Sequence, residues 1–211
     1  MQTLSETILE RGARFLQTPE ILARMDDQTQ ADIRNGKKEF FLADFFIRKR
    51  IPGFAGTIDL IKEVDNRQVG INNLDKALLP TGTYMALCIA GLSYGLDPAS
   101  TTPDIPAGIR YSSAEYLNTI PTKIINSEFN LLNGDKPVLK VRTKKFFANA
   151  YAEYAGEANE ENGVMLPQPK LLDYRKKVKA QLEFAEDATA VPAGAHYLEV
   201  RLVGVFVGDR I

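Results

Sequence analysis

Two runs of alternating apolar and polar residues flank Asn133-Gly134. An Asn-Gly pair between such runs is a strong short-range signal for an antiparallel β-hairpin, because both residues tolerate the backbone angles of a tight turn. A shift of one residue in the pairing would turn every side chain to the other face, so the pattern also restricts the register. A three-residue loop that starts at Asn133 keeps one face apolar, with Phe129 opposite Leu139. We therefore predict a hairpin with one buried face.

Length and composition are those of an ordinary globular chain. The 211 residues are 45% hydrophobic and 25% charged, enough for a sizeable core in one domain, with or without an appendage. The formal net charge of −1 gives no overall field that favours nucleic acid or an acidic membrane. The single cysteine, Cys88, lies in an apolar run, so we expect a buried thiol and no disulfide. No apolar run approaches the ~18 residues of a membrane span, and residues 1–15 lack the pattern of a signal peptide.

Residues 3–34 have the pattern of two helices. Thr3 and Glu6 form a capping box, and Thr18-Pro19-Glu20 begins a second helix that ends at Asn35-Gly36. A helix with a thin apolar stripe needs a surface to lie on, which either the rest of this chain or a neighbouring subunit would provide. We therefore assign residues 1–36 to a helical arm. Its second stripe consists of Ile21, Leu22, Met25 and Ile33.

From residue 39 onward the period changes from helix to strand. Segment 39–51 is apolar and then basic, and its paired phenylalanines indicate cover on both faces near its start. The nearly continuous apolar run 83–95 is typical of a central strand, and 174–184 alternates like a strand with one exposed face. Long connections are expected over 96–121 and 149–172.

The last predicted strand, 196–211, changes character along its length. It first alternates, with Leu198, Val200 and Leu202 on one face, and from Val203 both faces are apolar. Another layer, the N-terminal helices or a neighbouring subunit must therefore cover the second face. Together with the helical stripe, this end of the strand forms the candidate assembly interface: Ile21, Leu22, Met25, Val203, Val205 and Val207.

Seven or eight strands, long connections and no helix–strand alternation favour a mainly β protein. We predict an antiparallel sandwich of jelly-roll or Greek-key type, in which residues 37–211 form a single β domain after the N-terminal helical arm.

The sequence contains one match to a catalytic motif, the G-x-S-x-G pattern around Ser93. In hydrolases a helix follows this motif at once, whereas here a proline-rich segment follows, so we expect a strand that ends in small turn residues. His196 is the only histidine, so a metal site with a pair of histidines is excluded. We expect His196 at the surface. We therefore expect no enzyme activity, no metal and no cofactor.

Three short basic segments, 48–50, 144–145 and 175–177, are expected to be solvated strand edges or members of ion pairs. If they converged in space, they would form a surface for nucleic acid, with Phe146 and Phe147 available for stacking on bases. This convergence is a hypothesis.

The combination of features resembles the jelly-roll coat proteins, capsid or vertex, of tailless icosahedral bacterial viruses. The resemblance is a pattern of strands over 39–207 and not a specific motif, and the chain has room for only one jelly roll where many major coat proteins have two. The segments that carry it are FFLADFFIRKR (40–50), LLPTGTYMALCIAGLSYG (78–95), the hairpin at Asn133-Gly134 and HYLEVRLVGVFV (196–207).

The resemblance implies a virion structural protein, a self-assembling capsid subunit of a bacteriophage located in the virion. Its partners would be copies of itself and other virion proteins, with packaged nucleic acid as a further contact. The alternative is a non-catalytic receptor- or carbohydrate-binding β-sandwich that holds its ligand with the long connections. The candidate ligand-contacting residues are then Tyr111, Tyr116, Tyr151 and Tyr154.

Overall fold

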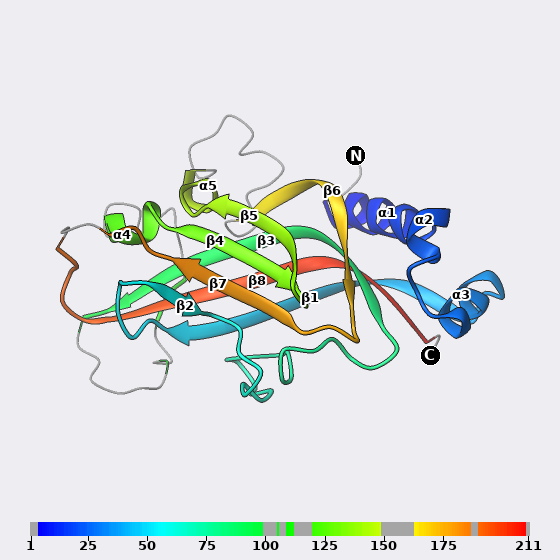
Figure 1. Cartoon of the computed structure of the whole chain (residues 1–211), viewed down its shortest axis with the longest axis horizontal. Helices are drawn as coiled ribbons and strands as arrows, with labels where there is room; N and C mark the ends of the chain where they lie inside the picture. The colour runs from blue at the N-terminus through cyan, green and yellow to red at the C-terminus, as the bar shows by residue number, and fades with distance from the viewer. Residues whose placement is uncertain are drawn as a thin grey trace.

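The computed structural model describes residues 4–98, 105, 109–111, 120–148, 163–186 and 190–209. Two antiparallel four-stranded sheets pack face to face, so the prediction of a mainly β sandwich is confirmed (Figure 1). The strands are β1 (Lys38–Arg50), β2 (Thr57–Asp59), β3 (Tyr84–Asp97), β4 (Glu128–Asn133), β5 (Lys136–Arg142), β6 (Gly163–Asp173), β7 (Val178–Glu183) and β8 (Ala195–Asp209). The helices are α1 (Leu4–Leu16), α2 (Pro19–Leu22), α3 (Asp27–Arg34), α4 (Thr122–Ile125) and α5 (Lys144–Ala148).

The long strands form one sheet, here called sheet A, in the order β1-β8-β3-β6. The shorter strands form sheet B, in the order β2-β7-β4-β5. The main core lies between the two sheets. Leu198, Val200 and Leu202 of β8 belong to it, as their alternation predicted, and Phe129 of β4 and Leu182 of β7 contribute from sheet B.

A second apolar cluster lies on the other face of sheet A, beneath the N-terminal helices. Ile8 and Leu16 of α1 pack there with Tyr84, Cys88 and Val205 of the sheet. Cys88 is buried, as predicted, and burial raises the pKa of its thiol to about 11. The N-terminal helices thus cover the second face of β8, at the right-hand end of the view in Figure 1.

Strand β3 contributes side chains to both clusters, and a β-bulge changes which positions face each cluster. Before the bulge, Met85 and Leu87 face the main core, while Tyr84 and Ala86 face the helices. The pairing shifts between Leu87 and Ile89, so the next core residues are Ala90, Leu92 and Tyr94. Because both faces of β3 are covered, the segment is apolar almost without interruption.

The predicted second N-terminal helix is divided into α2 and α3. Asp26 caps α3, since its carboxylate accepts a hydrogen bond from the Thr29 backbone N–H at 2.8 Å. Thr18 does stand before Pro19, but its hydroxyl donates to the Phe15 carbonyl, so the predicted side-chain cap is absent there. The segment ends at Asn35-Gly36, as predicted.

The hairpin of β4 and β5 forms, and its buried face is the predicted one, but its register is not. Phe129 pairs with Val141 and not with Leu139. The turn is tighter than expected, because Asn133 already pairs with Lys136, and a bulge next to it shifts the pairing by one more residue. The tighter turn and the bulge each shift the register by one residue, and together they return the same side chains to the buried face.

Two predictions about sheet A were wrong. Strand β6 occupies the second half of the segment expected to be a long connection and extends one residue beyond it. It tolerates Pro167 and Pro169 because it is an edge strand. The start of β1 is not covered on both faces, since Phe41 and Leu42 are 43% and 42% exposed. Strand β1 forms the other edge of the sheet.

Candidate functional site

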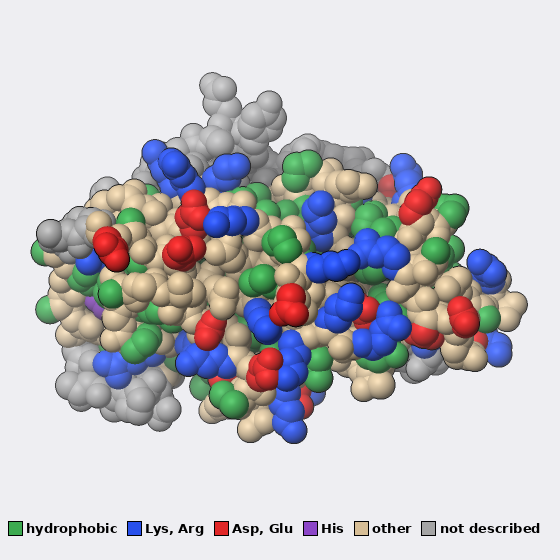
Figure 2. Space-filling model, viewed as in Figure 1, with side chains coloured by type: hydrophobic (Ala, Val, Ile, Leu, Met, Phe, Trp, Pro, Cys, Tyr) green, Lys and Arg blue, Asp and Glu red, His purple; other side chains and the backbone are tan. Residues whose placement is uncertain are grey.

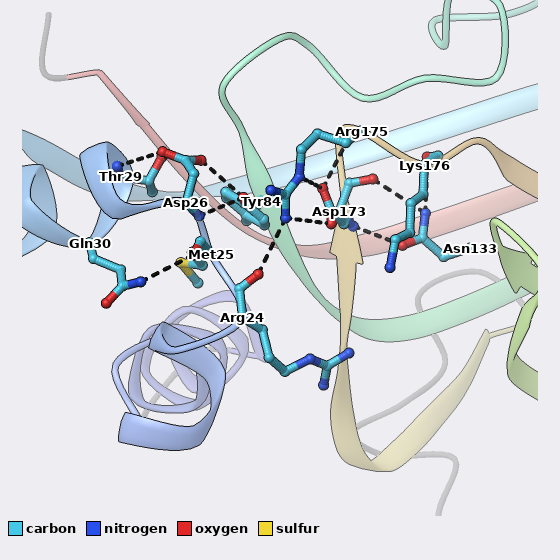
Figure 3. A network of polar contacts seen from close by, with 10 residues as sticks. All are labelled: Arg24, Met25, Asp26, Thr29, Gln30, Tyr84, Asn133, Asp173, Arg175 and Lys176. Atoms are coloured by element: carbon cyan, nitrogen blue, oxygen red, sulfur yellow. Dashed lines mark hydrogen bonds and ion pairs between the residues drawn. The ribbon is translucent and has the colours of Figure 1, made fainter.

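The β4–β5 turn and the β6–β7 turn lie side by side, and Asn133 joins them (Figure 3). Its side-chain oxygen accepts a hydrogen bond from the Asp173 backbone N–H at 2.9 Å, and its amide donates to the Lys176 carbonyl at 3.0 Å. The Gly134 backbone N–H donates to the Lys177 carbonyl at 2.7 Å. Because Asn133 is only 5% exposed, these bonds replace bonds to water and fix one turn against the other.

Arg175 connects the two turns to the N-terminal helices. Its guanidinium donates two hydrogen bonds of 2.9 Å to the Asp173 carboxylate and one of 3.3 Å to the Arg24 carbonyl. It also lies over the rings of Tyr84 and Tyr174. Burial by itself raises the pKa of Asp173, but hydrogen bonds and positive charge from Arg175 more than offset it, so that this pKa is lowered.

Asp26 provides the third connection, between the α2–α3 segment and β3. The Tyr84 hydroxyl donates to the Asp26 carboxylate at 3.0 Å, and the Asp26 backbone N–H donates to the Tyr84 oxygen at 3.0 Å. Burial raises the pKa of Asp26, but hydrogen bonds from Thr29 and Tyr84 outweigh it and lower the pKa. Burial also raises the pKa of Tyr84 to about 12.

These contacts adjoin a cavity of about 440 Å³ with basic walls, which we call the basic pocket. Five lining side chains are cationic and one is anionic, a formal net charge of +4 in a chain whose total is −1. Lys and Arg side chains gather in this part of the surface, right of centre in Figure 2. The lining residues are Arg24, Asn133, Lys136, Pro137, Val138, Lys170, Leu171, Asp173, Arg175 and Lys176.

Among the residues that the structure describes, four of the five cations form no ion pair. Asp173 pairs with Arg175, but within the ranges that the structure describes no carboxylate forms an ion pair with the remaining four. They are Arg24, Lys136, Lys170 and Lys176. Their positive charge is therefore available to an external anion.

Segments 48–50 and 175–177, two of the three basic segments singled out in the sequence, do not converge. Arg48 pairs with Glu199 at 2.6 Å, Lys49 pairs with Asp65 at 2.8 Å, and Lys177 pairs with Glu63. Segment 48–50 ends β1 next to Tyr197, at the end of sheet A remote from the β6–β7 turn. The expectation that these side chains form ion pairs is confirmed for Arg48, Lys49 and Lys177. Most of the cations that line the basic pocket come from other segments.

The candidate assembly residues lie largely inside the chain. Four of them are at most 9% exposed and share the cluster beneath the helices: Ile21, Met25, Val205 and Val207. Leu22 packs partly against that cluster, and Val203 is half-buried. A contact between subunits through these side chains would therefore require the helices to leave their own sheet.

Of the candidate ligand-contacting tyrosines, only Tyr111 lies among the described residues; Tyr116, Tyr151 and Tyr154 lie outside them. The Arg48 guanidinium carbon is 4.9 Å from the centre of the Tyr111 ring. Burial raises the pKa of the Tyr111 hydroxyl, which has no hydrogen-bond partner in the described part of the chain. One face of this ring is thus already occupied by a cation.

Ser93 lies inside β3, where it pairs with Glu199 and is 6% exposed. The strand continues to Asp97, so the expectation that it ends at the motif was wrong. The motif therefore does not form the strand-to-helix turn that raises a nucleophilic serine in hydrolases.

His196 was expected at the surface, but it is 5% exposed. Its Nε2 lies 2.9 Å from the Pro192 carbonyl, which can only accept, so Nε2 carries the proton. Nδ1 then accepts the hydrogen bond from the Tyr94 hydroxyl at 2.7 Å. The ring packs edge-on against Phe54, and burial lowers the pKa of the imidazole.

Comparison with known proteins finds no family model that matches this chain and no curated protein that matches its sequence. Among the described residues, no group of three or more His, Cys, Asp or Glu side chains is placed to hold a metal ion. No helix in the same residues is both long and apolar enough to cross a membrane.

Proposed function

We propose that this chain is a virion structural protein of the jelly-roll type, a self-assembling capsid subunit of a bacteriophage. The observation that carries the proposal is the order in which its strands pair. A jelly roll is a long hairpin wrapped into two sheets, so that its eight strands pair first with last and inward from there.

All four nested pairs of such a hairpin are present. Strand β1 pairs with β8, β2 with β7, β3 with β6, and β4 with β5. The pairs β3–β8 and β4–β7 then join them into the two sheets. This pattern supports a jelly roll, an architecture that viral capsid proteins share with lectins. In this proposal residues 1–36 are an arm docked on sheet A of its own subunit.

The first part of β1, around Phe41 and Leu42, is the surface that we assign to contacts between subunits, since segment 71–73 is already hydrogen-bonded to the edge at Phe46 and Arg48. Phe41 and Leu42 are adjacent in an edge strand, so they lie on opposite faces of the sheet, and both are more than two-fifths exposed. Large apolar side chains on an edge strand favour association, because a second copy would remove both from water.

Light scattering over a range of concentrations, with negative-stain images of the same samples, tests this proposal. We expect rings or shells from the full chain, and loss of assembly in the double variant Phe41→Asp and Leu42→Asp. The matched control is Val64→Asp with Val69→Asp, which places the same charges at valines that are 79% and 94% exposed. A monomer at every concentration would contradict the proposal.

The alternative, a carbohydrate-binding sandwich, draws on the same strand order, because lectins also use it. A chain that stays monomeric and binds a defined set of glycans on an array would favour this alternative. Assembly in the absence of any glycan would disfavour it.

A further inference from the structure

We propose that the basic pocket is a binding site for phosphate groups. The inference concerns the chemistry of one surface and does not rest on the proposed role in a virion. Its ligand is an oxyanion that carries at least two negative charges, either free in solution or along a nucleotide strand.

The first argument is the balance of charge at the site. Arg24, Lys136, Lys170 and Lys176 surround one cavity, and no carboxylate in the described residues pairs with them. The only acid in the wall, Asp173, is held by Arg175. Like charges around one cavity repel one another, and a bound polyanion would relieve that repulsion.

The second argument is that the backbone under these cations is fixed. Asn133 holds the β6–β7 turn against the β4–β5 turn, and Arg175 holds the Arg24 carbonyl (Figure 3). The aliphatic stem of Lys176 lies over Gly134, where an added Cβ would stand 3.5 Å from its Cδ. A site whose frame is already ordered loses less entropy when it binds a ligand.

The third argument concerns the size of the site and the kind of cation. A cavity of about 440 Å³ lies within the range of small-molecule sites. Three of the four available cations are lysines, which bind phosphate as point charges and place little demand on its orientation. Both a pyrophosphate ion and consecutive phosphates of a single strand fit that description.

Calorimetric titration of the full chain with inorganic pyrophosphate tests the site. The test variant is Lys170→Gln with Lys176→Gln, and the matched control is Lys144→Gln with Lys145→Gln, which removes two exposed lysines from α5. We expect saturable binding to the wild type that is at least about tenfold weaker in the pocket variant, since two charge contacts are lost. The control variant should differ from the wild type by less than about twofold, and wild-type binding should weaken as salt is added.

Fluorescence anisotropy with a labelled single-stranded DNA separates the two sources of phosphate. If a strand is the ligand, the pocket variant weakens DNA binding and makes it less dependent on salt, whereas the α5 variant does neither. If the pocket variant loses pyrophosphate binding but binds DNA as well as the α5 variant does, the ligand of the pocket is a free phosphate compound. Equal effects of both variants on pyrophosphate, or no binding to the wild type at millimolar concentration, would overturn the proposal. Thermal unfolding of each variant verifies that it is folded.

Discussion

At the scale of single residues, His196 is a buried base that the fold keeps neutral. Its neighbours are uncharged: the Tyr94 hydroxyl, the Pro192 carbonyl and the ring of Phe54. The hydrogen bond from Nε2 to the Pro192 carbonyl favours an imidazolium ion, but it only partly offsets the cost of burying the charge, so the pKa of the imidazole is lowered. Protonation of His196 is therefore coupled to unfolding.

We expect the free energy of unfolding to fall as the pH drops below about 6.5. In the unfolded chain the imidazole titrates near its ordinary pKa of 6.5, whereas burial lowers the pKa in the folded chain. Below pH 6.5 the unfolded state thus binds more protons, so stability rises with pH in that window. Urea unfolding between about pH 5 and pH 7 measures the slope.

The variant His196→Gln is the control, because glutamine can donate to Pro192 and accept from Tyr94 without titrating. Its stability should be less dependent on pH over the same range. Asp26 and Asp173 have lowered pKa values, so the stability that they provide is lost only near and below the ordinary carboxylate pKa of 3.8. An unchanged slope in the glutamine variant would exclude His196 as the cause.

Gly12 marks the closest approach of α1 to sheet A. A Cβ added there would lie 2.6 Å from the Cβ of Val205, which is too close for any real contact. In a free helix, alanine is more favourable than glycine by about 1 kcal/mol. Here we expect Gly12→Ala to destabilise the fold by about 1–3 kcal/mol, because the helix must move away from β8.

Urea unfolding of Gly12→Ala measures this cost. Combining it with Val205→Ala removes the Cγ2 methyl group of Val205, which is the atom nearest to the new side chain. The double variant should therefore be more stable than the sum of the two single changes predicts. Strict additivity would show that the helix is not held against β8 at this point.

The basic pocket could not be predicted from local sequence. Arg24, Lys136, Lys170 and Lys176 come from four separate segments, and each is an ordinary surface cation within its own segment. His196 was misplaced for the same reason, since its partner Tyr94 lies 102 residues away in the sequence. Only the pairing of distant strands brings such residues together.

At the scale of elements, the pattern of apolar residues predicted several strands. Alternation located β7 and the first half of β8, and an unbroken apolar run located β3. It missed β6, because Pro167 and Pro169 argue against a strand unless that strand is known to be at an edge. It also missed the hairpin bulge, since a bulge changes the register and leaves no mark in the alternation.

The contact between the two turns should depend on Asn133. We expect Asn133→Ala to lower the free energy of unfolding by about 1–3 kcal/mol, because it leaves the Asp173 N–H and the Lys176 carbonyl without this partner. The matched control is Asn130→Ala on the same strand, at a half-buried position on the opposite face. That change should cost less than about 0.5 kcal/mol. Equal costs in thermal or urea unfolding would contradict the assignment.

At the scale of the whole molecule, the nested pairing of strands explains why the N-terminal helices stay with their own subunit. Pairing β8 between β1 and β3 leaves a face on which Tyr84, Cys88 and Val205 are apolar. Sheet B covers only the opposite face of sheet A. The helices therefore complete the fold, whether or not they also contact a neighbour.

Removal of residues 1–36 should therefore unfold or loosen the β domain itself. The truncation uncovers Tyr84, Ala86, Cys88 and Val207, each at most 1% exposed in the full chain, and exposed apolar area costs about 25 cal/mol per Å². We expect a lower midpoint of thermal unfolding and binding of a dye such as ANS, which reports exposed apolar surface. If the segment instead reached onto a neighbouring subunit, the truncated chain would remain a monomer with an unchanged midpoint and no dye binding. Loss of assembly alone cannot separate the two cases, so the unfolding midpoint of the truncated monomer is the measurement that decides between them.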